Sequence, residues 1–127
     1  MVILANVTCN TARSVYDPTT TGTSPPLLNL TGVYGHIEPV QINQLQVLPQ
    51  AALDVLYVLN VTTGTDIIVG DVITDLTLPD GVTPWPGAEA LGSNITWVVR
   101  HAQESAPIIL PSRMVYLAAV YTGAPAT

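Results

Sequence analysis

Two histidines, each close to an acid in the sequence, are the residues best suited to acid–base chemistry. His36 precedes Glu38, and His101 precedes Glu104. A histidine held by a carboxylate acts as a general base when both line a cleft. Both pairs, however, fall in segments that alternate as strands do, and no G-x-S-x-G turn supplies a serine nucleophile. The sequence therefore predicts no catalytic residue, and we expect the protein not to be an enzyme.

Four aspartates lie close enough in the sequence to raise the question of a cation site. They are Asp66, Asp71, Asp75 and Asp80, separated by five, four and five residues. An EF-type calcium loop takes its ligands from alternate residues, so this spacing does not fit one. We interpret these acids as markers of turns and strand ends, and the alternative is a looser calcium site. Cys9 is the single cysteine and is expected to be a buried thiol, so a thiolate zinc site is not expected. The sequence names no residues for another metal or for a cofactor, and we expect neither.

Composition places the chain among compact acidic proteins. The 127 residues are 48% hydrophobic and 9% charged, with nine acids, three arginines and no lysine, for a net charge of -6. Such a chain is too apolar to stay disordered. Three cations argue against a protein that holds DNA through its phosphates. We find no apolar run long enough for a membrane helix and no basic start typical of a signal peptide, so we expect assembly in the cytoplasm.

Eleven prolines, nine glycines and many β-branched residues indicate an all-β fold. We expect a single domain over residues 1–127, built as a small barrel or sandwich of about six antiparallel strands. A helical turn is expected only at 44–52, where Pro49 weakens it. The expected strands are residues 7–16, 30–42, 53–61, 67–75, 94–101 and 113–121.

The segment 53–61 alternates most clearly, but both of its faces carry apolar side chains. One face presents Leu53, Val55, Tyr57, Leu59 and Val61, and the other includes Leu56 and Val58. A strand of this kind is covered on both sides, which predicts a place in a barrel or at a contact between subunits.

Two long loops, near residues 17–26 and 77–93, exceed what a compact β domain needs and are candidates for function. The second contains Trp85 between two prolines, which stiffen the backbone and can present the ring to a partner. The alternative is that Trp85 folds back and covers one end of the barrel. The candidate partner-contact residues are Trp85, Pro84, Pro86, Asp17 and Pro18.

The order of short motifs resembles a known family. An early Arg13 and a Pro-rich loop are followed by GVYGHIEP at 32–39, DVLYVL at 54–59, GTDIIVGD at 64–71, TWVVRH at 96–101 and RMVYL at 113–117. This order is similar to small β-barrel head–tail joining proteins of tailed bacteriophages, of the stopper or head-closure type. The segment 64–71 carries most of the resemblance, because the family has a turn there, followed by a strand that enters the barrel. The family often has a basic residue where Ile68 stands and a shorter connection than 77–93.

The resemblance implies a structural virion protein that is assembled in the bacterial cytoplasm. Its copies would form a ring below the portal and adaptor, join them to the tail proteins and close the DNA-filled head. DNA would pass through the channel without specific binding, and no membrane would be involved. Cyclic assembly would cover a strand that is apolar on both faces. An acidic channel would repel the phosphate backbone.

Two other functions agree with the same sequence features. A capsid decoration protein that clamps the head lattice would also have Thr/Pro-rich loops and few charges. A ligand- or glycan-binding β domain would use Trp85 and tyrosines to stack on a sugar, although no polar cluster accompanies Trp85 in the sequence.

Overall fold

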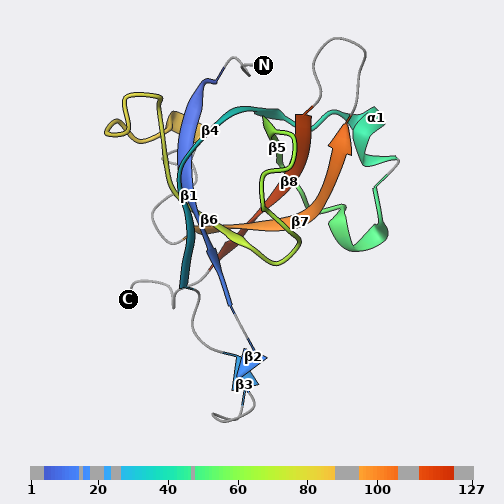
Figure 1. Ribbon diagram of the computed structural model, residues 1–127. Coiled ribbons are helices and arrows are strands. Elements are labelled where there is room, and N and C mark those ends of the chain that lie inside the picture. The colour runs from blue at the N-terminus through green and yellow to red at the C-terminus, as the bar shows by residue number, and fades with distance from the viewer. Residues whose placement is uncertain are drawn as a thin grey trace, which may run out of the picture.

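The computed structural model describes residues 5–14, 16–17, 22–23, 27–46, 48–87, 95–105 and 112–121. Eight strands and two short helical turns lie in these residues (Figure 1). In chain order they are β1 (Val7–Arg13), β2 (Tyr16–Asp17), β3 (Gly22–Thr23), β4 (Leu27–Pro39), α1 (Ile42–Leu45), the 3-10 turn η1 (Gln50–Ala52), β5 (Tyr57–Thr62), β6 (Val72–Thr77), β7 (Ile95–Ser105) and β8 (Ser112–Tyr121).

Six of the strands close into a barrel in the order β1-β4-β5-β8-β7-β6, and every pair is antiparallel. The predicted all-β fold is confirmed, and of the two predicted architectures the chain adopts the barrel. Among the described residues, the strands β2 and β3 pair only with each other. They form a separate ribbon, called the arm below, which Figure 1 shows beyond the barrel end from which β1 leaves and to which β4 returns.

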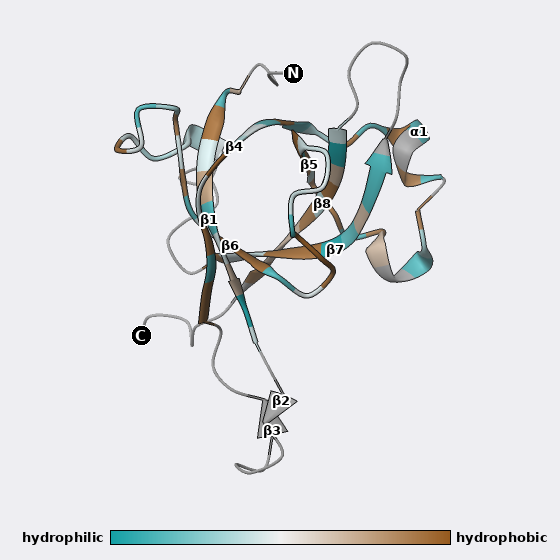
Figure 2. Cartoon of the chain, in the orientation of Figure 1, coloured by the Kyte–Doolittle hydropathy of each residue, from teal (hydrophilic) through white to brown (hydrophobic). Residues whose placement is uncertain are grey.

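Alternating side chains fill the barrel. Figure 2 shows hydrophobic residues along the barrel strands, interrupted by hydrophilic ones. The largest core cluster includes Val7, Leu59, Val61, Val99 and Leu117, all fully buried. Cys9 belongs to this cluster, as expected for a structural thiol, and its burial raises the pKa of the thiol to about 12. β-branched residues dominate the cluster because they pack well on a pleated sheet.

The second face of β5 is covered by the chain itself. Val58 is fully buried against Leu48, Ala52 and Val55, which come from the segment around α1 and η1. The predicted cover on both sides of this strand is therefore confirmed, and it is intramolecular. The apolar outer face of β5 consequently gives no reason to expect a neighbouring subunit at that position.

The helical prediction for 44–52 was partly right. The turns α1 and η1 lie on either side of Pro49, which is the residue before η1 and has no N–H to continue a helix. The residues 53–56, which were expected to begin a strand, instead form a turn after the end of η1 at Ala52 and then lead into β5. Within the described residues, no helix is long and apolar enough to cross a membrane.

The segment 67–75 differs most from the prediction, because β6 begins only at Val72. Residues 63–71 form an irregular connection in which Gly64 and Gly70 have positive φ angles of 82° and 95°. These angles suit glycine and end the regular strand geometry. The apolar run Ile67–Ile68–Val69 suggested a strand, although only Ile67 is buried.

Gly35 lies where β4 changes partners. Residues up to Gly35 pair with β1, and from His36 onward the strand pairs with β5. A Cβ at this position would lie 2.9 Å from the carbonyl oxygen of Asn60 and 2.7 Å from Leu59 Cδ1. Only glycine allows the two strands to approach this closely.

We predict that Gly35→Ala lowers the free energy of unfolding by about 2 kcal/mol, because the backbone of β5 must move to admit the methyl group. Urea denaturation measures the change. Thr31→Ala, at an exposed position of the same strand, is the control and should stay within about 0.5 kcal/mol of the parent. A Gly35→Ala protein as stable as the control would contradict the close approach.

Candidate functional site: the capped end of the barrel

Residues 63–71, called the cap below, cross one end of the barrel between β5 and β6 (Figure 1). The side chain of Ile67 is fully buried and belongs to the core cluster. Backbone bonds join the far side of the cap to β7, from Gly70 N–H to Val99 O at 2.9 Å and from Val99 N–H to Asp71 O at 2.9 Å. The cap therefore closes this end of the barrel with an apolar side chain.

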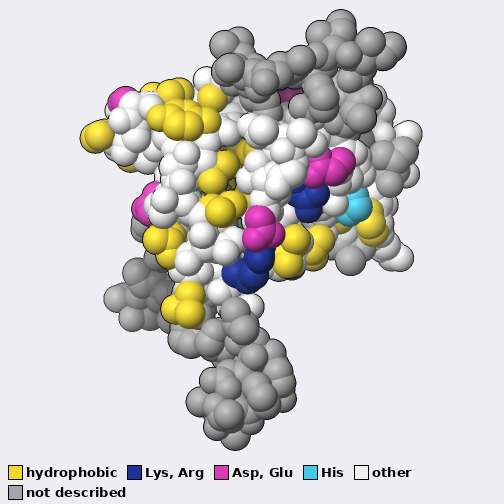
Figure 3. Space-filling view, in the orientation of Figure 1, with side chains coloured by type: hydrophobic (Ala, Val, Ile, Leu, Met, Phe, Trp, Pro, Cys, Tyr) yellow, Lys and Arg dark blue, Asp and Glu magenta, His cyan; other side chains and the backbone are white. Residues whose placement is uncertain are grey.

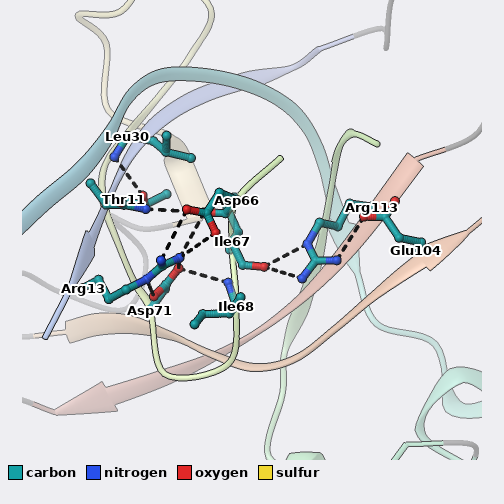
Figure 4. A network of polar contacts seen from close by, with 10 residues as sticks. Thr11, Arg13, Leu30, Asp66, Ile67, Ile68, Asp71, Glu104 and Arg113 are labelled. Carbon is teal, nitrogen blue, oxygen red and sulfur yellow. Dashed lines mark hydrogen bonds and ion pairs between the residues drawn. The ribbon is translucent and has the colours of Figure 1, made fainter. Parts of the chain in front are cut away.

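Arg13, the last residue of β1, holds the cap from one side (Figure 4). Its Nε donates to Asp71 Oδ1 at 2.8 Å and its Nη2 to Asp71 Oδ2 at 2.9 Å, a two-point contact. Nη2 also lies 3.1 Å from Asp66 Oδ1. Asp71 is only 1% exposed, and its Oδ2 additionally accepts the N–H of Ile68 at 3.0 Å. One arginine thus neutralises the buried acid and ties both halves of the cap to β1.

Arg113 of β8 holds the cap from the other side (Figure 4). Its Nε and Nη2 both donate to the carbonyl oxygen of Ile67, at 2.8 and 2.6 Å, and its Nη1 donates to Glu104 Oε1 at 3.0 Å. Glu104 in turn accepts from the Thr63 hydroxyl and from Gly64 N–H, where the cap begins. Strands β7 and β8 therefore fix the first half of the cap.

These contacts shift the pKa values of the charged groups so that each charged form is favoured. The Arg13 guanidinium holds the pKa of Asp66 below its ordinary value, and the hydrogen bond from Thr63 does the same for Glu104, with help from Gly64 and Arg113. The two aspartates raise the pKa of Arg13. Every one of these shifts favours the charged form, so the cap is held by ionised groups at neutral pH.

The arrangement offers rigidity. The guanidinium groups of Arg13 and Arg113 are directed at acids and carbonyl oxygens of the same chain. Outside the buried core, the cap exposes Ile68 and Val69, which are 45% and 59% exposed. An exposed apolar pair on a firmly held loop is suited to contact with another protein.

The opposite end of the barrel is closed by the tryptophan that the sequence singled out. Trp85 makes edge-to-face contacts with Tyr57 at 4.8 Å and with Trp97 at 6.0 Å between ring centroids. The backbone N–H of Trp85 donates to Leu76 O at 3.0 Å. This is the position expected in the alternative in which Trp85 folds back over one end of the barrel. Its contact with a partner remains a prediction.

The other predicted partner-contact residues are only partly described. Pro84 and Pro86 are exposed on either side of Trp85, and Pro84 bridges to Thr77. The backbone of Asp17 belongs to β2 and pairs with Gly22 in the arm. Pro18 lies outside the described residues. The structure thus separates Asp17 in the arm from the group around Trp85.

His36 and His101 make separate contacts, on β4 and on β7. His36 Nε2 is 3.8 Å from Glu38 on the exposed surface of β4. His101 contacts Gln103 at 3.0 Å and the ring of Tyr116, whereas its neighbour in sequence, Glu104, turns to the cap. Of the two histidine–acid pairs in the sequence, His36 and Glu38 are in contact at the surface, whereas Glu104 contacts the cap.

The four aspartates that the sequence marks as turn residues do not meet at one point, although two of them share Arg13. Asp66 and Asp71 bind Arg13, Asp75 accepts from Asn10 at 2.8 Å, and Asp80 accepts from Val82 and Thr83 of its own turn. Across the part of the chain that the structure describes, no three His, Cys, Asp or Glu side chains group as a metal site would require.

Sequence reasoning missed the role of the cap and of Asn6. The side chain of Asn6 donates to Ile37 O at 3.0 Å and accepts Ile37 N–H at 2.8 Å, so it replaces a backbone partner beside β4. The signal that could have revealed the cap was Asp71, which directly precedes an expected strand. A buried acid needs a cation beside it, and the chain has only three arginines to supply one.

Comparison of the chain with protein-family models, with curated proteins and with solved structures finds no significant match.

We predict that Arg13→Ala lowers the free energy of unfolding by about 3 kcal/mol, because Asp71 is left as an uncompensated buried charge. Arg100→Ala is the matched control, since Arg100 pairs with Asp54 at the surface and such pairs contribute less than about 1 kcal/mol. Both variants are compared by urea denaturation at neutral pH. Equal losses in the two would show that burial of Asp71 does not govern the cap.

We also predict a loss of stability in acid that depends on Thr63. Since the pKa values of Asp66 and Glu104 are lowered on folding, their contribution is complete above the ordinary values of 3.8 and 4.5 and is lost as the pH falls through the folded values. In Thr63→Val the pKa of Glu104 moves back toward its ordinary value, so the fall in stability from about pH 5 to about pH 3 becomes shallower.

The measurement is the free energy of unfolding in urea across this pH range. Thr65→Val is the control, because the Thr65 hydroxyl bonds to Thr62 O and to no carboxylate. A Thr63→Val profile parallel to that of the control would refute the assignment.

Proposed function

We propose that this chain is a structural virion protein of a tailed bacteriophage. In this role its copies form a ring at the neck of the particle, below the portal and adaptor and above the tail, and close the DNA-filled head. The observation that carries the proposal is the clamped cap at 63–71. It is the GTDI…GD segment of the resemblance, and it contains a turn followed by β6, as the resemblance implies.

The separate arm supports the same role. A rigid barrel suits a place in a ring, and a ribbon that leaves the barrel suits contact with a neighbour above or below it (Figure 1). The arm interrupts the chain between Arg13 and Leu27, which pair with each other at the capped end. Small barrels host many functions, so the fold alone carries little of this argument.

The charges support passage of DNA without binding. The chain has a net charge of -6, and each of its three arginines is paired with an acid of the same chain. Protein–DNA affinity depends on cations that replace counterions at the phosphates. Cations already engaged with carboxylates serve this purpose poorly, and a net negative surface repels DNA.

The chief alternative, a capsid decoration protein, draws on the same rigid barrel and exposed apolar groups. The glycan-binding alternative receives less support, because Trp85 already contacts Tyr57 and Trp97 within the chain.

We predict that cryo-electron microscopy of the virus particle will locate the chain as a ring between the portal and the tail. A particle produced without the chain should consist of heads that lack tails and lose DNA, and the chain supplied from a plasmid should restore tailed particles. Density spread over the head lattice, with tailed but fragile particles when the chain is absent, would instead establish the decoration role. Absence from the particle would rule out both.

A further inference from the structure

Among the described residues, the ladder between β6 and β7 is the shortest in the barrel. It consists of two cross-strand pairs, Val72 with Val98 and Ile73 with Trp97. β7 pairs with β8 along its whole described length, and every other pair of neighbouring strands also shares a longer ladder. The contact between β6 and β7 is called the seam below.

The backbone of the chain leaves regular strand geometry on both sides of the seam. Gly70 has a φ of 95°, and Asp75 has a φ of 52°, in the left-handed region that a residue with a Cβ rarely adopts. The side chain of Asn10 on β1 donates to Asp75 Oδ2 at 2.8 Å and so ties this residue to the neighbouring strand. Because regular strands have negative φ angles, the ladder with β7 is interrupted at both positions.

The cap bridges the seam at one end. Gly70 N–H donates to Val99 O and Val99 N–H donates to Asp71 O, both at 2.9 Å, so the cap extends the short ladder. Arg13 binds the cap from β1, which neighbours β6, whereas Arg113 binds it from β8, which neighbours β7. Figure 3 shows this face, on which basic side chains lie directly against acidic ones. The two arginines therefore hold the two sides of the seam together through the cap.

Trp85 bridges the seam at the other end. Its backbone N–H donates to Leu76 O of β6 at 3.0 Å, and its ring contacts the ring of Trp97 on β7 at 6.0 Å between centroids. The backbone of Gly87 lies so close to the Trp85 ring that it leaves no room for a Cβ. The two features that close the ends of the barrel are therefore also the contacts that join β6 to β7 beyond their short ladder.

From this arrangement we propose that the barrel opens along the seam, so that β6 separates from β7 while the other strands stay paired. The cap and Trp85 hold the seam closed. Opening exposes the core side chains of Ile73 and Trp97, which are 2% and 4% exposed in the closed barrel, so the open form is a minor state in equilibrium with the closed one. A closed barrel has no free strand edge, and the open form presents one on β6 and one on β7. The opening is a property of the isolated chain and does not depend on the proposed function.

Amide hydrogen exchange of the full chain, followed residue by residue by NMR, tests the opening. The amides of Gly70 and Val99 donate across the seam. They should exchange at least about tenfold faster than the amides of the β5–β8 ladder, after correction for intrinsic rates. Exchange of the two seam amides as slow as that of the β5–β8 ladder would overturn the proposal, and this outcome requires no substitution.

A disulfide across the seam separates local opening from unfolding of the whole barrel. Val72→Cys/Val98→Cys places two thiols on directly paired residues, and the control Asn60→Cys/Met114→Cys does the same between β5 and β8. Cys9 is buried and does not compete for oxidation. Oxidation of the seam pair should slow the exchange of the two seam amides at least about tenfold, and oxidation of the control pair should leave it unchanged. Equal slowing by both disulfides would mean that these amides exchange only when the whole barrel unfolds, which rules out the seam.

Removal of the contact at the far end should also open the seam. Trp85→Ala should speed the exchange of Gly70 and Val99 at least about tenfold, and by more than it speeds the exchange of the β5–β8 ladder, because the two ends belong to one opening. Val82→Ala is the matched control, since Val82 lies in the same connection as Trp85 and is 79% exposed. Equal acceleration of the seam and of the β5–β8 ladder would show that Trp85 stabilises the whole barrel and does not hold the seam.

Discussion

The buried ion pair between Arg13 and Asp71 is the interaction on which the capped end depends. Asp71 is 1% exposed, and a carboxylate in such a place must be neutralised and hydrogen-bonded. Arg13 supplies both requirements from the last residue of β1, and Ile68 N–H completes the set. We interpret the pair as a device that fixes the path of the chain into β6, because buried ion pairs contribute less to net stability than apolar packing does.

Local patterns were sufficient to predict much of the barrel. Alternating β-branched residues identified β1, β7 and β8 to within a few residues, and the punctuation by proline and glycine pointed to short strands. The same reasoning failed at the cap, because Ile67, Ile68 and Val69 follow one another as they would in a buried strand. The cap leaves strand geometry at Gly64 and Gly70, and it is held by Arg13, 58 residues from Asp71 in the sequence, which no local pattern reveals.

The candidate site was recognised only in parts. The sequence marked Asp66 and Asp71 as turn residues and Trp85 as either an anchor or a cover for the barrel end. It could not show that Arg13 gathers the two acids, because the contact exists only once the barrel has closed. The contacts of Trp85 within the chain could not be predicted either, because Tyr57 and Trp97 come from two different strands, β5 and β7.

Closure of both ends determines where a channel would run. Ile67 fills one end of the barrel, and Trp85 packs against Tyr57 and Trp97 at the other. Nothing as wide as a DNA duplex passes through such an interior. In the proposed ring the channel therefore lies between copies, and the outer surface of the barrel lines it.

The position of the arm has a mechanical consequence. The chain leaves the barrel after Arg13 and returns at Leu27, and these two residues form the last pair of the β1–β4 ladder. A pull on the arm loads that ladder from its end, where hydrogen bonds perpendicular to the strands would open one after another. The first residue to feel the tension is Arg13, whose guanidinium is anchored to the cap. The contacts of Arg13 with the cap are therefore placed where they resist the separation of β1 from β4. A strong enough pull would release the cap together with the last pair of the ladder.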